Sequence, residues 1–428
     1  MNAAPLATPQ ERTPLAPIIV IGALFFIFGF VTWLNGPLIT FVKLAFDLDT
    51  DARAFLVTTA FYLSYFFLAL PSSWILERTG MKKGMALGLL VMAAGAFVFG
   101  SFATARWYPG ALGGLFVIGS GLSLLQCASN PYISVLGPIE SAAQRISLMG
   151  ICNKVAGIIA PLAIGSTVLS GIDVIEKQAR QLPAGPQREA LLNEFAAKVH
   201  VPYLLMAGIL ALLAVWILRS PLPEISAAQA NTRPRTPGRR ERDSIFQFPH
   251  LWLGVVCLFL YVGVEVMAGD AIGAYGRGFD LPVGQTKYFT TLTMSAMLVG
   301  YLAGMVAIPR FITQSRGLSI SALLGVIFSV AAWLTTGYVS VGFVAALGLA
   351  NALMWPVIFP LAIEGLGRFT ERGSALLVMG IAGGAIIPRL FATMKEQFPF
   401  QTVFLAIMAP CYLYILYYAL RGHRVGQD

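Results

Sequence analysis

A cluster of hydrogen-bonding side chains lies inside a long apolar stretch of the sequence. The stretch runs from about residue 111 to 136 without a charged residue, yet it contains Gln126, Ser129, Asn130 and Tyr132. In hydrocarbon, each polar group without a hydrogen-bond partner costs several kcal/mol, so these side chains must face protein, water or a ligand. The pattern predicts a site that binds a polar solute about halfway across a membrane.

Charged residues also fall inside apolar stretches that are long enough to cross a membrane, namely Lys154, Glu265, Asp270 and Arg389. An ionised side chain in hydrocarbon is costly, so such residues usually pair with one another and mark a functional site. Glu265 and Asp270 are candidates for binding a coupling cation, and Asp270 lies closer to the outer mouth. Lys154, next to Asn153, either contacts a hydroxyl or carbonyl group of the solute or extends to the inner surface.

Further amide and aromatic side chains occur in other apolar stretches, and they suit the hydroxyl groups and the C–H face of a sugar. These are Trp33 and Asn35 near the N-terminus, and Asn351 and Trp355 in the second half of the chain. The alternative role of the amides is a hydrogen bond between two helices. Trp355 precedes Pro356, so packing or a bend is an alternative role for it.

The composition is that of a membrane protein. The 428 residues are 57% hydrophobic and 11% charged, whereas a soluble domain has about 25% charged residues. The net charge of +9 would suit nucleic acid as a partner. However, Lys and Arg are concentrated in the loops of one side, which membrane orientation explains, so the lipid bilayer is the expected partner.

A helix that spans a bilayer needs about 20 largely apolar residues, and the sequence contains twelve such stretches. They lie at about 18–45, 54–77, 84–105, 110–135, 145–170, 201–219, 249–272, 286–308, 317–338, 340–363, 373–395 and 399–420. The fold class predicted is therefore an all-α membrane protein with twelve transmembrane helices.

A polar interruption in the middle of the chain divides these helices six and six. We predict an N-terminal tail (1–17), an N-terminal six-helix bundle (18–219), a cytoplasmic linker (220–248), a C-terminal six-helix bundle (249–421) and a C-terminal tail (422–428). The excess of Lys and Arg in alternate loops places both termini in the cytoplasm.

An internal repeat relates the two halves. Residues 144–147 (QRIS) and 157–161 (GIIAP) recur at a constant offset as residues 371–374 (ERGS) and 384–388 (GAIIP). Both copies begin on the predicted inner side, so the halves form a parallel, pseudo-symmetric repeat such as major facilitator transporters have.

The loop between helices two and three resembles the signature of the same superfamily, an acid and an arginine followed by Gly and paired basic residues. It contains Glu77, Arg78, Lys82 and Lys83. These charges could latch the inner side until the halves move apart. Ordinary positive-inside residues are the alternative interpretation.

Several longer stretches resemble the fucose–galactose–glucose:proton symporter family of the major facilitator superfamily. The resemblance covers nearly the whole chain, and it implies a sugar transporter in which helices one, four, seven and ten line the cavity. The stretches are 28–35 (FGFVTWLN), 61–66 (FYLSYF), 69–71 (ALP), 128–132 (ASNPY), 261–266 (YVGVEV) and 376–379 (LLVM).

Two positions depart from the pattern of fucose permease-like members. An aspartate there follows the asparagine of helix one, and a glutamate opens the motif of helix four. This chain has Gly36 and Gln126 at these positions. Gln126 can form hydrogen bonds but cannot titrate, so the coupling role of these acids is not carried over.

The fold implied by the resemblance also places helices seven and eleven next to each other. Glu265 and Arg389 lie equally far along these helices from their inner ends, so we predict an ion pair between them. A carboxylate that switches its charge state during transport is one reading of the pair, and a permanent structural pair is the other.

The leading hypothesis is import of a neutral sugar across the bacterial inner membrane, coupled to protons through Glu265. Glucose, galactose and N-acetylglucosamine are the candidate substrates. Sodium coupling, uncoupled diffusion and a non-transporting sugar sensor are the alternatives. No enzyme, metal or cofactor is expected, because the three histidines lie at loops or helix ends and no catalytic or metal-ligand spacing occurs. We expect a monomer.

Overall fold

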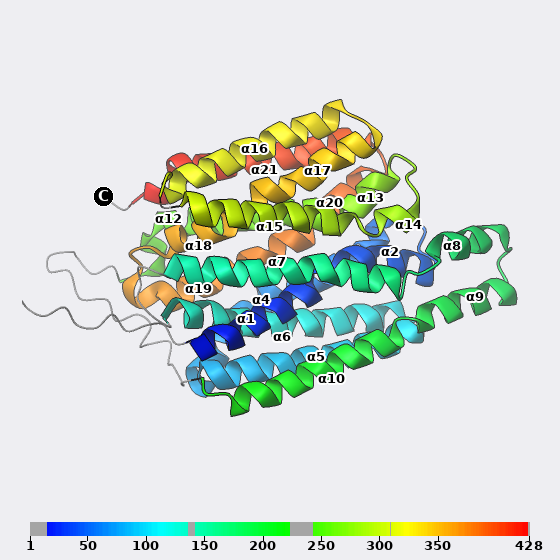
Figure 1. The fold of residues 1–428 in the computed structure, drawn as a ribbon, viewed down its shortest axis with the longest axis horizontal. Helices are drawn as coiled ribbons and strands as arrows, with labels where there is room; N and C mark the ends of the chain where they lie inside the picture. Colours follow the sequence, from blue (N-terminus) through cyan, green and yellow to red (C-terminus); the bar gives the residue numbers. More distant parts are fainter. Residues whose placement is uncertain (1–14, 136–141, 223–242, 309, 427–428) are drawn as a thin grey trace, which may run out of the picture.

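The computed structural model describes residues 15–135, 142–222, 243–308 and 310–426, and these residues form helices and connecting segments without a β-strand. Most of the predicted N-terminal tail, most of the predicted linker and the last two residues lie outside the described part of the chain. Figure 1 shows the helices side by side along one long axis.

The N-terminal half begins with helix α1 and ends with α10. Its helices are α1 (Leu15–Trp33), α2 (Asn35–Ala45), α3 (Asp51–Ala54), α4 (Leu56–Thr79), α5 (Met81–Thr104), α6 (Tyr108–Val135), α7 (Ala142–Ser166), α8 (Ile172–Gln181), α9 (Pro186–Ala197) and α10 (His200–Arg219).

The C-terminal half begins with a short 3₁₀ turn and ends with another. Its elements are η2 (Ile245–Gln247), α12 (Pro249–Gly269), α13 (Ile272–Arg277), α14 (Val283–Thr286), α15 (Phe289–Ala307), α16 (Gln314–Leu334), α17 (Gly337–Asn351), α18 (Met354–Ile363), η3 (Gly367–Phe369), α19 (Thr370–Met379), η4 (Gly380–Ala382), α20 (Gly383–Met394), α21 (Phe400–Leu420) and η5 (Gly422–Arg424).

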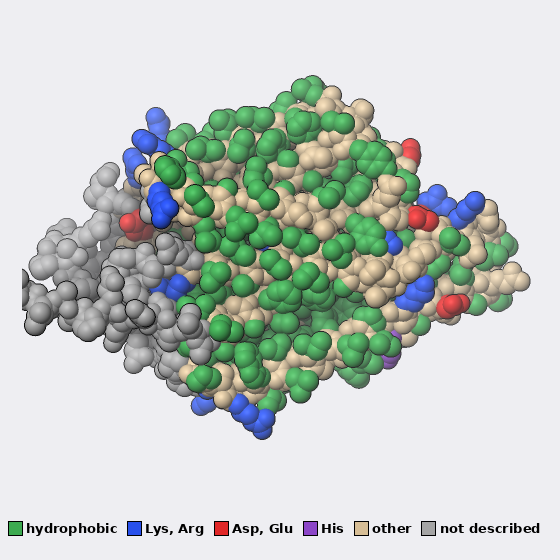
Figure 2. Space-filling model, in the orientation of Figure 1, with side chains coloured by type: hydrophobic (Ala, Val, Ile, Leu, Met, Phe, Trp, Pro, Cys, Tyr) green, Lys and Arg blue, Asp and Glu red, His purple; other side chains and the backbone are tan. Residues whose placement is uncertain are grey.

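The twelve predicted membrane spans are confirmed: twelve helical segments are long and apolar enough to cross a bilayer. Figure 2 shows hydrophobic side chains over the middle of one face, with Lys, Arg, Asp and Glu towards the two ends. This distribution fits a hydrocarbon layer around the middle of the molecule.

The two ends of the long axis differ. We call the end where α10 finishes and α12 starts the linker end, and the opposite end, where α8, α9, α13 and α14 lie, the loop end (Figure 1). These names do not depend on which end faces the cytoplasm.

Each half is a bundle of its own helices. In the N-terminal half α5 packs between α6 and α10, and α1 packs on α7; in the C-terminal half α16 packs on α17 and α21, and α12 packs on α20. The halves meet where α7 packs against α15 and where α4 packs against α19 and α20. The fold is therefore the predicted pair of six-helix bundles.

Several predicted spans are interrupted rather than continuous. The first span breaks after Trp33 and the tenth after Asn351. A proline shortly after each break explains both: Pro37 removes the N–H that would bond to the carbonyl of Trp33, and Pro356 removes the one that would bond to the carbonyl of Ala352. The broken ends lie beside Asn35 and Asn351, which are both buried.

The seventh and eleventh spans are also interrupted, at Asp270 and at η4. The glycines of η4 and α20 let the eleventh span approach α12 closely, because a Cβ atom at Gly383 would collide with the carbonyl oxygen of Phe259. The interruptions place irregular backbone between the halves, where neighbouring protein groups can satisfy it.

Candidate functional site

A cavity lies between the two halves, towards the linker end. Its walls come from the ends of α4 and α6, the first residue of α5, and from α18 and α19. The lining residues are Ser73, Leu76, Met81, Gln126, Cys127, Asn130, Phe359, Ser374, Ala375 and Val378.

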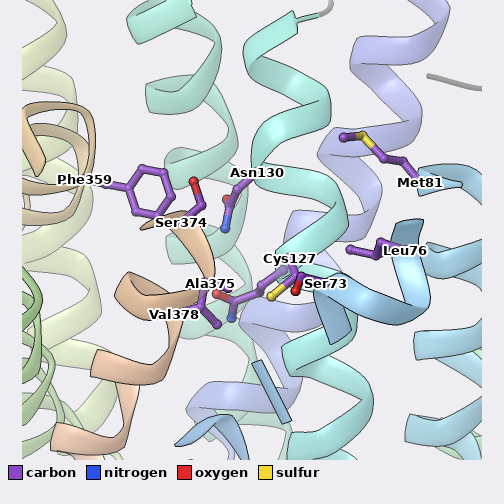
Figure 3. A pocket seen from close by; sticks show the side chains of 10 residues that line it. Ser73, Leu76, Met81, Cys127, Asn130, Phe359, Ser374, Ala375 and Val378 are labelled. Carbon is purple, nitrogen blue, oxygen red and sulfur yellow. The ribbon is translucent and has the colours of Figure 1, made fainter. Parts of the chain in front are cut away.

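Hydrogen-bonding groups from both halves reach this cavity. Gln126 and Asn130 are four residues apart on α6 and so lie on one face of the helix. Figure 3 shows Asn130 facing the side of the cavity formed by Ser374 and Phe359. Two of the predicted solute-binding residues thus line one cavity, although their role in binding stays a prediction.

A line of polar groups leads from this cavity into the molecule. Gln126 Nε2 donates to Tyr65 Oη at 3.1 Å. The rings of Tyr65 and Tyr62 are stacked one helical turn apart, with centroids 6.4 Å apart. Tyr62 Oη donates to Asp270 Oδ2 at 3.4 Å. The sequence did not indicate a role for the two tyrosines, because aromatic residues on an apolar helix usually serve packing.

Asp270 lies at the break between α12 and α13 and is only 1% exposed. Its Oδ1 is close to the backbone of Gly36 but has no hydrogen-bond partner of ordinary geometry in the described part of the chain. A Cβ atom at position 36 would lie 2.5 Å from Thr290 Oγ1. A side chain at position 36 would therefore have to displace the Thr290 hydroxyl, and the acid at this point of the interface is Asp270 of the seventh span.

A second buried cluster joins α7 to α12. Lys154 Nζ contacts Glu265 Oε1 at 2.8 Å and lies 4.4 Å from the centroid of the Trp33 ring. The indole N–H of Trp33 donates to Asn153 Oδ1 at 3.2 Å. Four predicted site residues therefore lie together, and their ion pair connects the two halves.

The predicted ion pair between Glu265 and Arg389 is wrong, because Glu265 pairs with Lys154. On α20 it is Ile387 that faces α12, where it packs against Gly263. Arg389 is half-buried next to the exposed Leu390. Equal distance along two helices does not determine which faces of the helices meet.

The remaining candidates for solute binding lie outside the cavity. Asn35 Nδ2 donates to the carbonyl of Thr32 at 3.0 Å, and Asn351 Oδ1 accepts from Tyr412 Oη at 2.8 Å. The hydrogen bond of Asn351 joins α17 to α21, which matches the alternative interpretation of this amide as a link between two helices.

Ser129 does not line the cavity, whereas Trp355 contacts a residue that does. Ser129 is fully buried away from it. The ring of Trp355 stacks on Phe359, which lines the cavity, with centroids 5.7 Å apart.

The residues of the predicted inner latch lie at the linker end. The guanidinium of Arg78 lies over the ring of Trp74, and Lys82 Nζ donates to the carbonyl of Ser220 at 2.8 Å. Both contacts stay within the N-terminal half, and Glu77 and Lys83 are exposed. Over the described residues no ion pair links these side chains to the C-terminal half, so the latch stays a prediction for another conformation.

A cluster of charges holds the halves together at the loop end. Asp51 of α3 forms ion pairs with Lys43 of the same half and with Lys395 and Arg277 of the other half. Arg277 also donates to Thr40 Oγ1 at 3.0 Å. Burial lowers the pKa of Lys395, an effect that the charge of Asp51 opposes. Because the cluster joins distant loops, the sequence pattern gave no sign of it.

Further contacts close the loop end. Lys287 Nζ donates to the carbonyl groups of Gly165 and Leu169, at 2.8 Å each. Asp173 Oδ1 accepts from the backbone N–H of Gly284 at 2.8 Å. The halves are thus joined at the loop end, while the cavity between them lies towards the linker end.

Comparisons with known proteins agree with this architecture. The sequence profile of the Major Facilitator Superfamily matches residues 21–388. A glucose/galactose transporter of Brucella abortus is 32% identical over 404 residues, which are 94% of this chain and 92% of that protein. The L-fucose-proton symporter of Escherichia coli is 28% identical over 398 residues, 90% of this chain and 88% of that protein.

Solved structures show the same fold. The crystal structure of FucP, a transporter of the superfamily in the outward conformation, superposes with a TM-score of 0.74 at 27% sequence identity. The match covers 95% of this chain and 99% of that one.

Proposed function

The chain belongs to the major facilitator superfamily, and we propose that it imports a neutral sugar of the glucose or galactose type by alternating access. It is a multi-pass protein of the cell inner membrane. A relative that shares 32% of its residues over nearly the full length is named a glucose/galactose transporter.

One observation carries the proposal: hydrogen-bonding side chains of both halves meet in a cavity that is closed at the loop end. Amide and hydroxyl groups such as those of Gln126, Asn130 and Ser374 can exchange hydrogen bonds with sugar hydroxyls. Phe359 and Cys127 supply apolar surface for the C–H face of a sugar ring. Six of the ten lining residues are apolar, so the choice of a sugar over an apolar drug rests on the named relatives.

We infer the orientation in the membrane from the charge distribution. Lys and Arg are more frequent in the loops of the linker end, which the positive-inside rule assigns to the cytoplasm. The cavity is then on the cytoplasmic side, and the cluster around Asp51 closes the outer side. Because one chain supplies every residue of the cavity, we propose a monomer as the working unit.

We also propose that a proton accompanies the sugar. A relative of 28% identity is named an L-fucose-proton symporter, and this chain has carboxyl groups, Glu265 and Asp270, buried between its halves. Neither group belongs to a cluster of three or more potential metal ligands in the described ranges. Sodium coupling and uncoupled transport are the competing possibilities.

Counterflow in proteoliposomes tests the proposed function. Vesicles loaded with unlabelled glucose, galactose or N-acetylglucosamine should transiently accumulate the same labelled sugar from outside, and protein-free vesicles should not. An acid-outside pH gradient should then drive net accumulation of the sugar that exchanges. Binding of a sugar without any counterflow would indicate a sensor and contradict the proposal.

A further inference from the structure

A buried carboxyl group without a cation of its own lies between the halves. Asp270 belongs to the C-terminal half, but its Oδ2 accepts a hydrogen bond from Tyr62 of the N-terminal half, and its Oδ1 lies beside Gly36. Building on the proposed function, we propose that Asp270, rather than Glu265, carries the coupling proton. Tyr62 and Tyr65 then connect it to the cavity.

The charges around Asp270 support this assignment. The groups around it are Glu265 from α12, Lys154 from α7, Tyr62 from α4, Gly36 from α2 and Thr290 from α15, and Asn35 lies next to Tyr62. Among these, Lys154 has the positive charge, and its ammonium is in contact with Glu265 at 2.8 Å.

The ammonium group of Lys154 is therefore the one positive charge among these groups, next to two buried carboxyl groups, Glu265 and Asp270. Lys154 balances Glu265, so an ionised Asp270 would leave a net negative charge in a dry interface. Such a charge is unfavourable where neither water nor a cation compensates it. Asp270 is thus neutral, with a proton on its carboxyl, while the interface around it is closed.

The direct neighbours of Asp270 line a path towards the cavity. Tyr62 is in hydrogen-bond contact with Asp270, Tyr65 stacks on Tyr62, and Gln126 bonds to Tyr65 at the wall of the cavity. These side chains mark the path from the buried acid to the cavity, and because stacked rings do not relay a proton, water has to complete the path. Water that enters when the halves separate there can accept the proton.

In each cycle Asp270 takes up one proton on one side of the membrane and releases it on the other. When the loop end is open, a proton from water forms an O–H bond with the Asp270 carboxylate. The neutral carboxyl permits the halves to close over it. When the linker end opens, the O–H bond breaks, the proton passes to water in the cavity, and the carboxylate stays behind. One proton crosses the membrane per cycle.

Variants of the two acids distinguish this proposal from coupling through Glu265. In proteoliposomes with glucose and galactose, Asp270→Asn should retain counterflow, lose accumulation driven by the pH gradient, and lose the pH dependence of exchange. Glu265→Gln should keep a pH-dependent accumulation. Its pH profile should move to lower pH, because Lys154 is then free to stabilise the Asp270 carboxylate.

The opposite pattern would overturn the assignment: accumulation that survives in Asp270→Asn, or pH dependence that is lost only in Glu265→Gln. A wild-type protein that shows counterflow but no acid-driven accumulation would also overturn it, while the sugar-carrier function would stand. Absence of counterflow in the wild type would instead contradict the proposed function itself.

A conservative variant covers the case in which Asp270→Asn does not fold. Asp270→Glu keeps a titratable group at a slightly different place, so accumulation should persist with a displaced pH profile. A profile identical to that of the wild type would show that position 270 does not titrate during transport and would refute the proposal.

Discussion

At the scale of single residues, we predict that sugar binding depends on Gln126 and Asn130, the amides that α6 presents to the cavity. If each amide bonds to the sugar, Gln126→Ala or Asn130→Ala removes a hydrogen bond worth about 0.5–1.5 kcal/mol and should weaken binding by about two- to tenfold. Equilibrium binding of labelled sugar to the purified protein measures the effect. Ser120→Ala is the matched control, because the Ser120 hydroxyl bonds to its own helix at Phe116. Wild-type affinity in both amide variants would contradict the site.

The ion pair of Lys154 and Glu265 is a residue-scale feature that affects stability. Lys154→Met leaves the buried carboxylate of Glu265 without its partner, which typically costs about 3–5 kcal/mol. We expect a clear fall in the Tm of the purified protein in detergent. The double variant Lys154→Met, Glu265→Gln removes both charges and should recover most of the loss. A double variant that is less stable than the single one would argue against a direct pair.

The sequence indicated which charged and amide residues belong to the site, but it did not indicate which of them pair with one another. Lys154, Glu265, Trp33 and Asn153 stood out because charged, amide and indole groups are rare in apolar stretches. Pairing depends on the faces that helices turn to one another. For this reason depth along the helix suggested Arg389, which α20 turns away from Glu265.

At the scale of the elements, the breaks in the spans are the main feature that hydropathy did not indicate. Length and apolar content predicted the twelve spans correctly, since a bilayer sets both. The break of the first span depends on one proline, Pro37, whereas a bend was predicted only at Pro356. The interruptions at Asp270 and η4 depend on tertiary packing between helices seven and eleven.

The break at Pro37 should matter for transport. Pro37→Ala restores an N–H group that can bond to the carbonyl of Trp33, so α1 and α2 can join into one helix. We expect the free energy of unfolding to rise by up to about 3 kcal/mol and the rate of counterflow to fall. Pro410→Ala within α21, a helix that does not line the cavity, controls for loss of a helix proline. An unchanged transport rate in Pro37→Ala would show that the break is not needed.

At the scale of the whole molecule, the contacts between the halves are unequal at the two ends. The cluster around Asp51 and the contacts of Lys287 join the halves at the loop end. In contrast, the matched crystal structure of FucP is in the outward conformation. Alternating access requires both arrangements, and the ion pairs at the loop end must break for the cavity to open there.

The internal repeat of the sequence was enough to predict two parallel bundles, because equivalent segments occur in helices five and eleven. It could not predict which side of the molecule is closed. That choice depends on ion pairs such as Asp51–Lys395, whose members lie in loops far apart in the chain.

The most direct test of alternating access is sugar counterflow with the loop end locked. In a protein with Asp51→Cys and Lys395→Cys, a short, reducible thiol crosslinker would join α3 to the end of α20. Counterflow of glucose or galactose should stop on crosslinking and return after reduction, while either single-cysteine variant should be unaffected by the reagent. Continued counterflow through the fully crosslinked protein would contradict a carrier whose halves must separate at this end.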